Sequence, residues 1–178
     1  HHGLFDVAML TTVPGVTVYS PSDTAELLQC LEQALYKDKG IVAVRYPRGC
    51  ELYRSGTKAY SDFRHVSNKS RKLIFTYGRI SAYAYTIHGV DVLQAIKIFP
   101  IADEIINICL AYDEIYAFEE GEREGGIAQK LCTALALAGF KGRFTITAVD
   151  GFVRHADVAA QLHNAMLDAD GMRKITGE

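Results

Sequence analysis

Two arginines, Arg45 and Arg48, flank Pro47 directly after the apolar run Ile41–Val44. The run predicts a buried strand, so both guanidinium groups come at the end of a core strand. A guanidinium is charged at every physiological pH, and its planar set of N–H donors matches a carboxylate or a phosphate. Pro47 fixes the backbone before Arg48, and Gly49 permits a sharp exit. The segment therefore predicts that Arg48 binds an anion, either a phosphate or the carboxylate of an interdomain ion pair.

Arg45, Asp6 and two serines are expected to hold the local structure rather than to react. Arg45 is interpreted as a structural residue that pairs with a carboxylate or with backbone carbonyls near the end of its strand. Asp6 can orient a neighbouring histidine or arginine, but a cap or turn is its favoured role. Ser20 and Ser22 precede a predicted helix and are interpreted as helix caps, not as nucleophiles.

A second loop of interest runs from Glu119 to Gly126, where two glycines precede a predicted helix. Backbone N–H groups at such a helix start can bind an anion. However, four glutamates crowd this loop with negative charge, which disfavours a phosphate. The glycine pair is therefore predicted to allow close packing against a neighbouring strand or subunit. His155 lies between a predicted strand and a predicted helix, and a packed or interface role is favoured for it over catalysis.

The elements that must position these residues begin with a strand–helix–strand unit. Val16–Tyr19 predicts a strand, and Ser20–Asp23 supplies the cap, the proline and the acidic residue typical of a helix start. Apolar residues at helical spacing continue to Leu35, and Gly40 ends the helix before the strand Ile41–Arg45. Such a unit is typical of a parallel sheet with crossover helices. It is too small to bury both faces of a sheet, so we expect half of a larger α/β domain with an exposed apolar face.

The second part of the chain follows a stretch, 51–72, that is rich in Ser, Lys, Arg and Tyr and predicts an interdomain linker. The predicted strands of this part lie at 73–77, 90–96, 114–119 and 144–149, and its predicted helices at 81–87, 100–112, 127–137 and 156–167. The segment between Tyr77 and Val90 is short for a crossover, which takes at least about 10–12 residues. We therefore expect either a shortened helix there or residues missing from the sequence.

Composition limits the classes of function. The chain has 178 residues, of which 49% are hydrophobic and 22% charged, with a net charge of −2, and these values are typical of a soluble globular protein. The lack of a basic surplus argues against binding to nucleic acid or to an anionic membrane. No apolar run is long enough for a transmembrane helix, and no signal peptide is visible. The four cysteines lack metal-binding spacing, so we expect reduced, buried thiols in a cytoplasmic protein and no zinc.

Several motifs together carry a resemblance to a known family. His1, Gly3 and Phe5–Asp6 are followed at matching spacing by Pro21–Asp23 and by Val44–Gly49. This pattern resembles the 1-deoxy-D-xylulose-5-phosphate synthase family of transketolase-like thiamine diphosphate enzymes. The resemblance covers essentially the whole chain and is most specific in its first part. In the second part it rests on looser matches at Tyr77–Gly78, Glu119–Glu120, Gly125–Gly126, Asp150–His155 and Leu167–Met172.

The resemblance implies a three-domain enzyme of which this chain is the C-terminal part. The implied fold class is α/β, with part of a thiamine-pyrimidine-binding domain at 1–57, a linker at 58–71 and a transketolase C-terminal domain at 72–178. That last domain is expected to have a mostly parallel central sheet with helices on both faces. The family binds thiamine diphosphate and Mg²⁺ through a Gly-Asp-Gly…Asn motif and activates the cofactor with a glutamate, and neither feature is found in this chain. We therefore expect the complete enzyme to bind both groups, and this chain alone to bind neither and to be inactive.

The resemblance also assigns roles to two residues. His1 matches the family histidine that faces the reacting carbon, and its imidazole suits proton transfer or hydrogen bonding to a sugar oxygen near neutral pH. Arg48 matches the arginine that holds the phosphate of glyceraldehyde 3-phosphate, beyond the carboxyl end of a strand, where open α/β sheets bind ligands. His2 falls at a variable position of the family and is expected to face solvent.

The implied reaction condenses pyruvate with glyceraldehyde 3-phosphate, with loss of carbon dioxide, to 1-deoxy-D-xylulose 5-phosphate, a precursor of isoprenoids and thiamine. The implied enzyme is a cytoplasmic, homodimeric transferase. Two alternatives stay open. The chain can belong to another transketolase-like enzyme, such as a sugar transketolase, because a phosphate-binding arginine suits either acceptor. It can also be a non-catalytic split subunit or assembly module.

Overall fold

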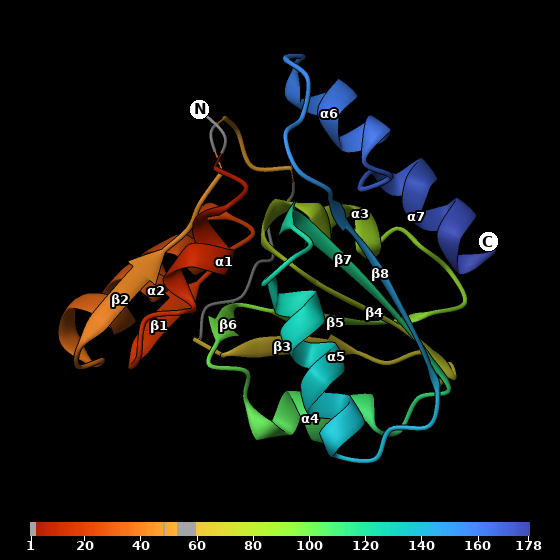
Figure 1. The fold of residues 1–178 in the computed structure, drawn as a ribbon, viewed down its shortest axis with the longest axis horizontal. Coiled ribbons are helices and arrows are strands. Elements are labelled where there is room, and N and C mark those ends of the chain that lie inside the picture. Colours follow the sequence, from red (N-terminus) through yellow and green to blue (C-terminus); the bar gives the residue numbers. More distant parts are fainter. Residues whose placement is uncertain (1–2, 48, 53–59) are drawn as a thin grey trace.

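The computed structural model describes residues 3–47, 49–52 and 60–178, and its strands form two sheets (Figure 1). The small sheet has three strands in the order β2-β1-β6, and the large sheet has five strands in the order β3-β5-β4-β7-β8. The predicted α/β class is confirmed. The two predicted site residues, His1 and Arg48, lie outside the described residues.

The first part of the chain forms most of the small sheet. Its elements are α1 (Asp6–Leu10), β1 (Val16–Tyr19), α2 (Thr24–Tyr36) and β2 (Ile41–Val44). β1 and β2 pair in parallel, which confirms the predicted strand–helix–strand unit. The sequence does not predict α1, because a helix of five residues shows little periodicity.

The cap of α2 differs from the predicted one. Asp23 is the N-cap residue, and its side chain accepts a hydrogen bond from the Glu26 N–H at 2.8 Å. Ser22 instead donates from its N–H and from its hydroxyl to Glu26 Oε2, each at 2.7 Å. Ser20 lies farther from the helix and makes strand-end contacts. The prediction that the serines cap this helix is therefore wrong, because the carboxylate of Asp23 takes that place.

The large sheet is mostly parallel, as predicted. Its strands are β3 (Phe63–Val66), β4 (Lys72–Tyr77), β5 (Asp91–Ala95), β7 (Glu114–Glu122) and β8 (Arg143–Val149). β4 pairs in parallel with β5 and β7, and β7 pairs in parallel with β8, whereas β3 runs antiparallel to β5 at one edge. β3 lies inside the stretch that the sequence predicts as a linker, and its half-exposed residues give little strand signal.

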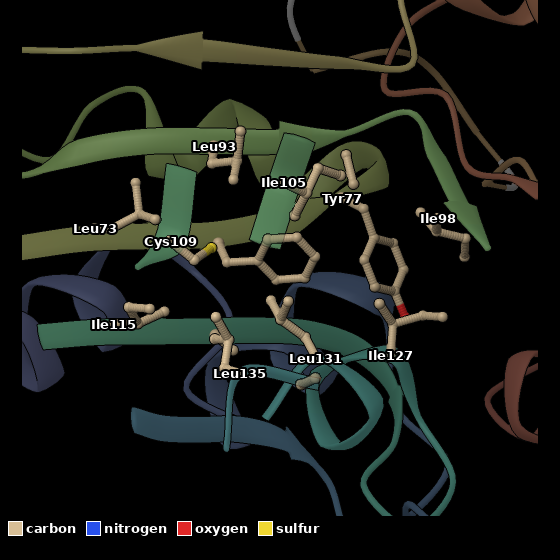
Figure 2. Close-up of a cluster of buried hydrophobic side chains, with 14 of the residues drawn as sticks. Leu73, Tyr77, Leu93, Ile98, Ile105, Cys109, Ile115, Ile127, Leu131 and Leu135 are labelled. Carbon is tan, nitrogen blue, oxygen red and sulfur yellow. The ribbon is translucent and has the colours of Figure 1, made fainter. Parts of the chain in front are cut away.

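Helices cover both faces of the large sheet. They are η1 (Gly78–Ile80), α3 (Ser81–Ala84), α4 (Asp103–Cys109), α5 (Ile127–Leu137), α6 (Val158–Asn164) and α7 (Ala169–Thr176). α4 and α5 lie on one face, and α3, α6 and α7 lie on the other (Figure 1). Figure 2 shows the first layer, where Leu73 and Leu93 of the strands meet Ile105 of α4 and Leu131 of α5. No helix within the described ranges has both the length and the apolar character that crossing a membrane requires.

A short strand and a buried polar cluster join the two sheets. β6 (Lys97–Phe99) comes soon after β5 in the sequence but pairs antiparallel with β1. In the cluster, Glu26 of α2 accepts a hydrogen bond from Gln94 Nε2 of β5 at 3.0 Å and pairs with Arg64 Nη2 of β3 at 2.8 Å. The sequence does not predict β6, because its partner strand lies far away in the chain and local periodicity carries no information about it.

The crossover from β4 to β5 is a shortened helix. η1 and α3 together occupy 78–84, and the chain continues through Thr86–Gly89 without a break. β4 and β5 still pair in parallel from Leu73 to Tyr77. The segment thus forms a shortened helical crossover between the two parallel strands.

Candidate active site

A cavity of about 380 Å³ lies between the two sheets, and we call it the inter-sheet cavity. It is found where parallel strands end: Ser20 follows β1, Arg45 to Pro47 follow β2, and Gly78 follows β4. Open α/β sheets bind ligands at the carboxyl ends of their strands. The charged residues in its wall are Asp6, Arg45, Arg79 and Glu120, with His155 at one side. We therefore treat this cavity as the candidate active site.

A second cavity, of about 500 Å³, lies along β8 beside α6 and α7. Its wall mixes apolar and polar side chains and includes Arg123 and Arg154, of which Arg123 is already paired. Arg123 donates from Nε to Asp150 Oδ1 at 2.5 Å and from Nη1 to the Ile146 carbonyl at 2.9 Å. These contacts close the free edge of β8, so we assign this cavity no catalytic role.

The floor of the inter-sheet cavity is a close approach of Ser20 and Gly78. The Gly78 N–H donates to the Ser20 carbonyl at 3.2 Å, which joins the end of β4 to the end of β1. A Cβ atom on Gly78 would lie 2.9 Å from Ser20 Oγ, and the Gly78 φ angle is +64°. Glycine accepts this backbone conformation without the steric cost of a side chain. A glycine at this position is therefore needed to bring the two strand ends together.

Arg45 ties the segment after β2 to both sheets. Its Nε contacts Asp6 Oδ2 at 2.9 Å, and its Nη2 donates to the Glu120 carbonyl at 2.6 Å. The guanidinium also lies over the Tyr77 ring, 5.9 Å from the ring centroid. The predicted structural role of Arg45, paired with a carboxylate and with carbonyls, is confirmed. Asp6 orients this arginine, whereas the favoured cap role is wrong, because Phe5 is the N-cap residue of α1 and no side chain of the described residues caps that helix.

Arg79 and Glu120 form a second ion pair in the cavity wall. Arg79 Nε donates to Glu120 Oε2 at 2.8 Å, while its Nη2 donates to Glu120 Oε1. Only 14% and 17% of the two side chains are exposed. Two parallel bonds fix the plane of the guanidinium. Sequence reasoning missed Arg79, although its place directly after the predicted strand 73–77, at the same sheet edge as Arg45, was the available signal.

Glu119, the neighbour of Glu120 in β7, is a buried carboxylate that lies at the start of α5. It accepts hydrogen bonds from the Tyr77 hydroxyl at 2.6 Å and from the N–H groups of Ile127 and Ala128 at 2.9 and 2.8 Å. Burial raises the pKa of Glu119, although these hydrogen bonds favour its charged form. The helix start that could bind an anion is thus filled by the protein's own carboxyl group.

The two glycines before α5 allow close packing, as predicted. A Cβ atom on Gly126 would lie 2.6 Å from Glu119 Oε1, and one on Gly125 would lie 3.3 Å from Ala8 Cβ. Gly125 also has a φ angle of +78°. The pair therefore lets α5 begin against the Glu119 carboxylate and against α1 at the same time.

The structure describes His155 but not His1, so only the predicted role of His155 can be compared with it. His155 lies at the inter-sheet cavity and is exposed, so the predicted packed role is wrong and an interface role stays a prediction. His1 falls among the residues that the structure does not describe, as does Arg48, so their roles also stay predictions. The described residues that meet at the cavity are instead two arginine–carboxylate pairs.

Two of the four cysteines are deeply buried. Burial raises the pKa of Cys30 and of Cys109 to about 12, which keeps both as unreactive thiols. Cys132 is half-buried and Cys50 is exposed, and all four are free. The prediction of buried thiols therefore holds for two cysteines and is wrong for Cys50.

The described residues offer no ligand set for a metal ion. Nowhere among them do three or more His, Cys, Asp or Glu side chains gather closely enough to hold one. Magnesium bound to a diphosphate also takes carboxylate ligands, and the cavity carboxylates Asp6 and Glu120 are each paired with an arginine. The described residues thus do not fit the magnesium diphosphate end of thiamine diphosphate, and we assign no cofactor step to them.

The beginning of the chain and its whole length both match known proteins. Residues 1–51 match the family of the transketolase pyrimidine-binding domain. The chain is 30% identical over 183 residues to a 1-deoxy-D-xylulose-5-phosphate synthase from Thermus thermophilus, covering 98% of this chain and 29% of that protein. It is 31% identical over 184 residues to the protein of the same name from Chlorobium phaeovibrioides, covering 95% and 29%. The chain therefore spans less than a third of the length of these curated relatives.

A solved structure shares the fold. It is titled as a split gene transketolase, inactive beta4 tetramer, and the TM-score is 0.76 at 18% sequence identity. The match covers 94% of this chain and 59% of that one. At this identity it supports the fold alone. The curated relatives and the matched domain confirm the resemblance that the sequence predicts: the chain is similar, over nearly its whole length, to 1-deoxy-D-xylulose-5-phosphate synthases, and its first 51 residues match the transketolase pyrimidine-binding domain.

Proposed function

We propose that this chain is part of a thiamine-diphosphate-dependent 1-deoxy-D-xylulose-5-phosphate synthase. The complete enzyme joins pyruvate to glyceraldehyde 3-phosphate, releasing carbon dioxide and giving 1-deoxy-D-xylulose 5-phosphate. The observation that carries the proposal is the inter-sheet cavity at the carboxyl ends of β1, β2 and β4, with Tyr46 and Pro47 in its wall. The segment leading to Arg48 thus borders a ligand-sized space, in a chain whose relatives bear that enzyme's name.

In this proposal Arg48 binds the phosphate of the acceptor, and His1 contacts the acceptor or the reaction intermediate. The Arg48 guanidinium keeps its charge at any working pH, and its donors match phosphate oxygens. The His1 imidazole suits proton transfer near neutral pH. Arg45 supports the site indirectly, because its contacts with Asp6 and with the Glu120 carbonyl hold the end of β2 in place.

Thiamine diphosphate and Mg²⁺ belong, in this proposal, to the complete enzyme rather than to the described residues. The cofactor supplies the carbanion chemistry, while protein groups hold and orient the acceptor. The chain alone is then inactive. We further propose a homodimeric, cytoplasmic enzyme in which this chain divides into a pyrimidine-binding part at 1–57, a connecting stretch at 58–71 that contributes β3, and a C-terminal domain at 72–178.

An exposed apolar face supports a second candidate function, a non-catalytic subunit of a split enzyme. Leu28, Leu35 and Tyr36 of α2 expose 65%, 70% and 77% of their surface, and Ile41 of the edge strand β2 exposes 55%. Apolar side chains exposed together mark a protein–protein contact. The solved structure with this fold is titled as a split-gene transketolase. A split subunit would use this face to bind the chain that holds the cofactor.

The test uses the complete gene product and its Arg48→Ala variant. We expect the variant to raise the KM for glyceraldehyde 3-phosphate by about tenfold or more, since a charge-assisted contact is lost. The KM for pyruvate should change much less, because pyruvate carries no phosphate. A KM for glyceraldehyde 3-phosphate within about twofold of wild type would reject the role of Arg48.

Two further assays separate the alternatives. The first assay compares the activity with pyruvate as donor to the activity with ketose phosphates as donors. It distinguishes a 1-deoxy-D-xylulose-5-phosphate synthase from a sugar transketolase. The gene sequence upstream of His1 distinguishes a single-chain enzyme from a split subunit. A reading frame that continues into a Gly-Asp-Gly motif supports the single-chain enzyme, whereas a start codon near His1 supports the split subunit.

A further inference from the structure

The inter-sheet cavity holds two guanidinium groups among the described residues, and the protein holds them in different ways. Arg45 is a structural group, which donates to Asp6 and to backbone carbonyls and lies over an aromatic ring. Arg79 donates from Nε and Nη2 to one carboxylate, that of Glu120. Within the described part of the chain, Arg79 Nη1 has no hydrogen-bond partner. Arg79 therefore has donors left for a ligand.

We propose that Arg79 is a second phosphate-binding residue of this site and determines its preference for a phosphorylated acceptor. The identity of that acceptor rests on the proposed function, whereas the binding of a phosphate rests on the cavity itself. Arg79 follows β4 directly and shares the cavity wall with Tyr46 and Pro47. A phosphate in this space lies between two strand ends that belong to different sheets, with Arg79 at the end of β4.

The fixed plane of Arg79 favours this role. A free arginine loses side-chain freedom when it binds a ligand, and that loss weakens binding. Glu120 already holds two of the guanidinium nitrogens, and only 14% of the Arg79 side chain is exposed. The Arg79 side chain has therefore already lost its conformational freedom before the ligand binds. A guanidinium shared between a carboxylate and a phosphate can still donate from its remaining nitrogen.

The charges in the cavity define what Arg79 contributes. Among the described lining residues, the carboxylates Asp6 and Glu120 balance the cations Arg45 and Arg79. Arg79 therefore adds directed hydrogen bonds rather than net charge, and the net attraction for a phosphate is the part that the proposed function gives to Arg48. Glu120 is a positioning residue: it orients Arg79, and its own negative charge weakens the binding of an anion to Arg79. Removing that charge while keeping the side chain's shape should strengthen phosphate binding.

The first experiment measures kcat/KM of the complete gene product with D-glyceraldehyde 3-phosphate and with D-glyceraldehyde. For Arg79→Met we expect kcat/KM to fall by about tenfold or more with D-glyceraldehyde 3-phosphate. With D-glyceraldehyde, kcat/KM should stay within about twofold of the wild-type value. Arg71→Met is the matched control, because Arg71 makes a similar paired contact with Asp113 at the opposite end of the large sheet. It should alter neither value. Equal losses with both acceptors, or no loss, would overturn the proposal.

Glu120→Gln serves as the second variant, in case Arg79→Met fails to fold. An amide keeps an acceptor for Arg79 but removes the negative charge. We expect the KM for glyceraldehyde 3-phosphate to fall by about threefold, whereas the KM for D-glyceraldehyde should not change. A purely structural ion pair predicts the opposite, since weakening it would impair the use of both acceptors. A rise in the KM for both acceptors would therefore overturn the proposal.

A binding measurement separates this inference from the proposed function. D-glycerol 3-phosphate and glycerol are titrated into the wild-type gene product and the Arg79→Met variant by isothermal calorimetry. We expect wild type to bind only the phosphate, and the variant to bind it about tenfold more weakly. This result would stand even if no 1-deoxy-D-xylulose 5-phosphate were formed, in which case the proposed function alone would fail. Equal affinity of both proteins for the phosphate would overturn the role of Arg79 and leave the proposed function intact.

Discussion

The large sheet and the small sheet differ in how completely they are covered. Strand β4 of the large sheet lies under helices on both faces, and Leu73, Ile74 and Phe75 are at most 1% exposed. In the small sheet, β2 is partly exposed along its length and α2 turns apolar side chains to solvent. The large sheet thus has a complete core, whereas the small sheet leaves apolar side chains of α2 exposed. The inter-sheet cavity lies between the fully covered sheet and the partly covered one.

The largest expected effect comes from breaking the core of the large sheet. Phe75→Ala removes a side chain that is 1% exposed. We expect a loss of about 3–5 kcal/mol in the free energy of unfolding, because burial energy is lost and a cavity is left. Leu35→Ser is the matched change on α2, where the side chain is 70% exposed, and it should cost no more than about 0.5 kcal/mol. Urea unfolding followed by circular dichroism measures both, and equal losses would contradict the contrast between the sheets.

A smaller effect is expected where the large sheet meets α1 and α5. Gly126→Ala would place a methyl group 2.6 Å from Glu119 Oε1. We expect a loss of about 3 kcal/mol, because the added group overpacks a buried carboxylate and disturbs its hydrogen bonds. Gly139→Ala is the control, since Gly139 has a φ angle of +86° but open space around it, and it should cost about 1 kcal/mol. Thermal unfolding that shows Gly126→Ala to be the milder change would refute this packing.

The smallest effect depends on pH and concerns Asp91, at the start of β5. Asp91 accepts hydrogen bonds from Ser67, Tyr112, Asn68 and Ser70 at 2.7 to 3.1 Å. Burial opposes the charge, but these bonds hold the pKa of Asp91 below its usual range. Because the pKa is lower in the folded state, this stabilisation is present at neutral pH and is lost as the pH falls through the folded pKa.

Asp91→Asn is therefore expected to cost about 1–2 kcal/mol at pH 7. The free energies of unfolding of the variant and of wild type should converge as the pH falls through the lowered folded-state pKa of Asp91, because the wild-type carboxylate becomes protonated. Urea unfolding at several pH values measures this difference. Parallel curves over that range would show that Asp91 does not carry the acid sensitivity of the large sheet.

Much of the fold could be predicted because its signals are local. Apolar spacing marks α2 and α5, and short apolar runs mark β1, β2 and β4. β3 and β6 were missed for a physical reason, since each is short and gains its stability from a partner strand elsewhere in the chain. A sequence pattern reports which face a residue buries, but it does not report which distant strand will supply the other half of a hydrogen-bond ladder.

The candidate site was predictable only in part. Arg45 stands at the end of an evident strand, so its structural role followed from its residue type and place. Arg79 also follows a strand, but only the packing of η1 against β7 brings it to Glu120. Glu119 looked like one of several loop acids, yet it lies in β7 and is buried at the start of α5. Charge patterns in the sequence show how many acids a segment has, not which of them face inward.

The most direct test of the central claim supplies the complete gene product with pyruvate, glyceraldehyde 3-phosphate, thiamine diphosphate and Mg²⁺. Labelled pyruvate allows the products to be followed by ¹³C NMR. The account predicts 1-deoxy-D-xylulose 5-phosphate, with one carbon dioxide released for each molecule formed. Failure to form that product, with transfer from a ketose phosphate in its place, would contradict the account.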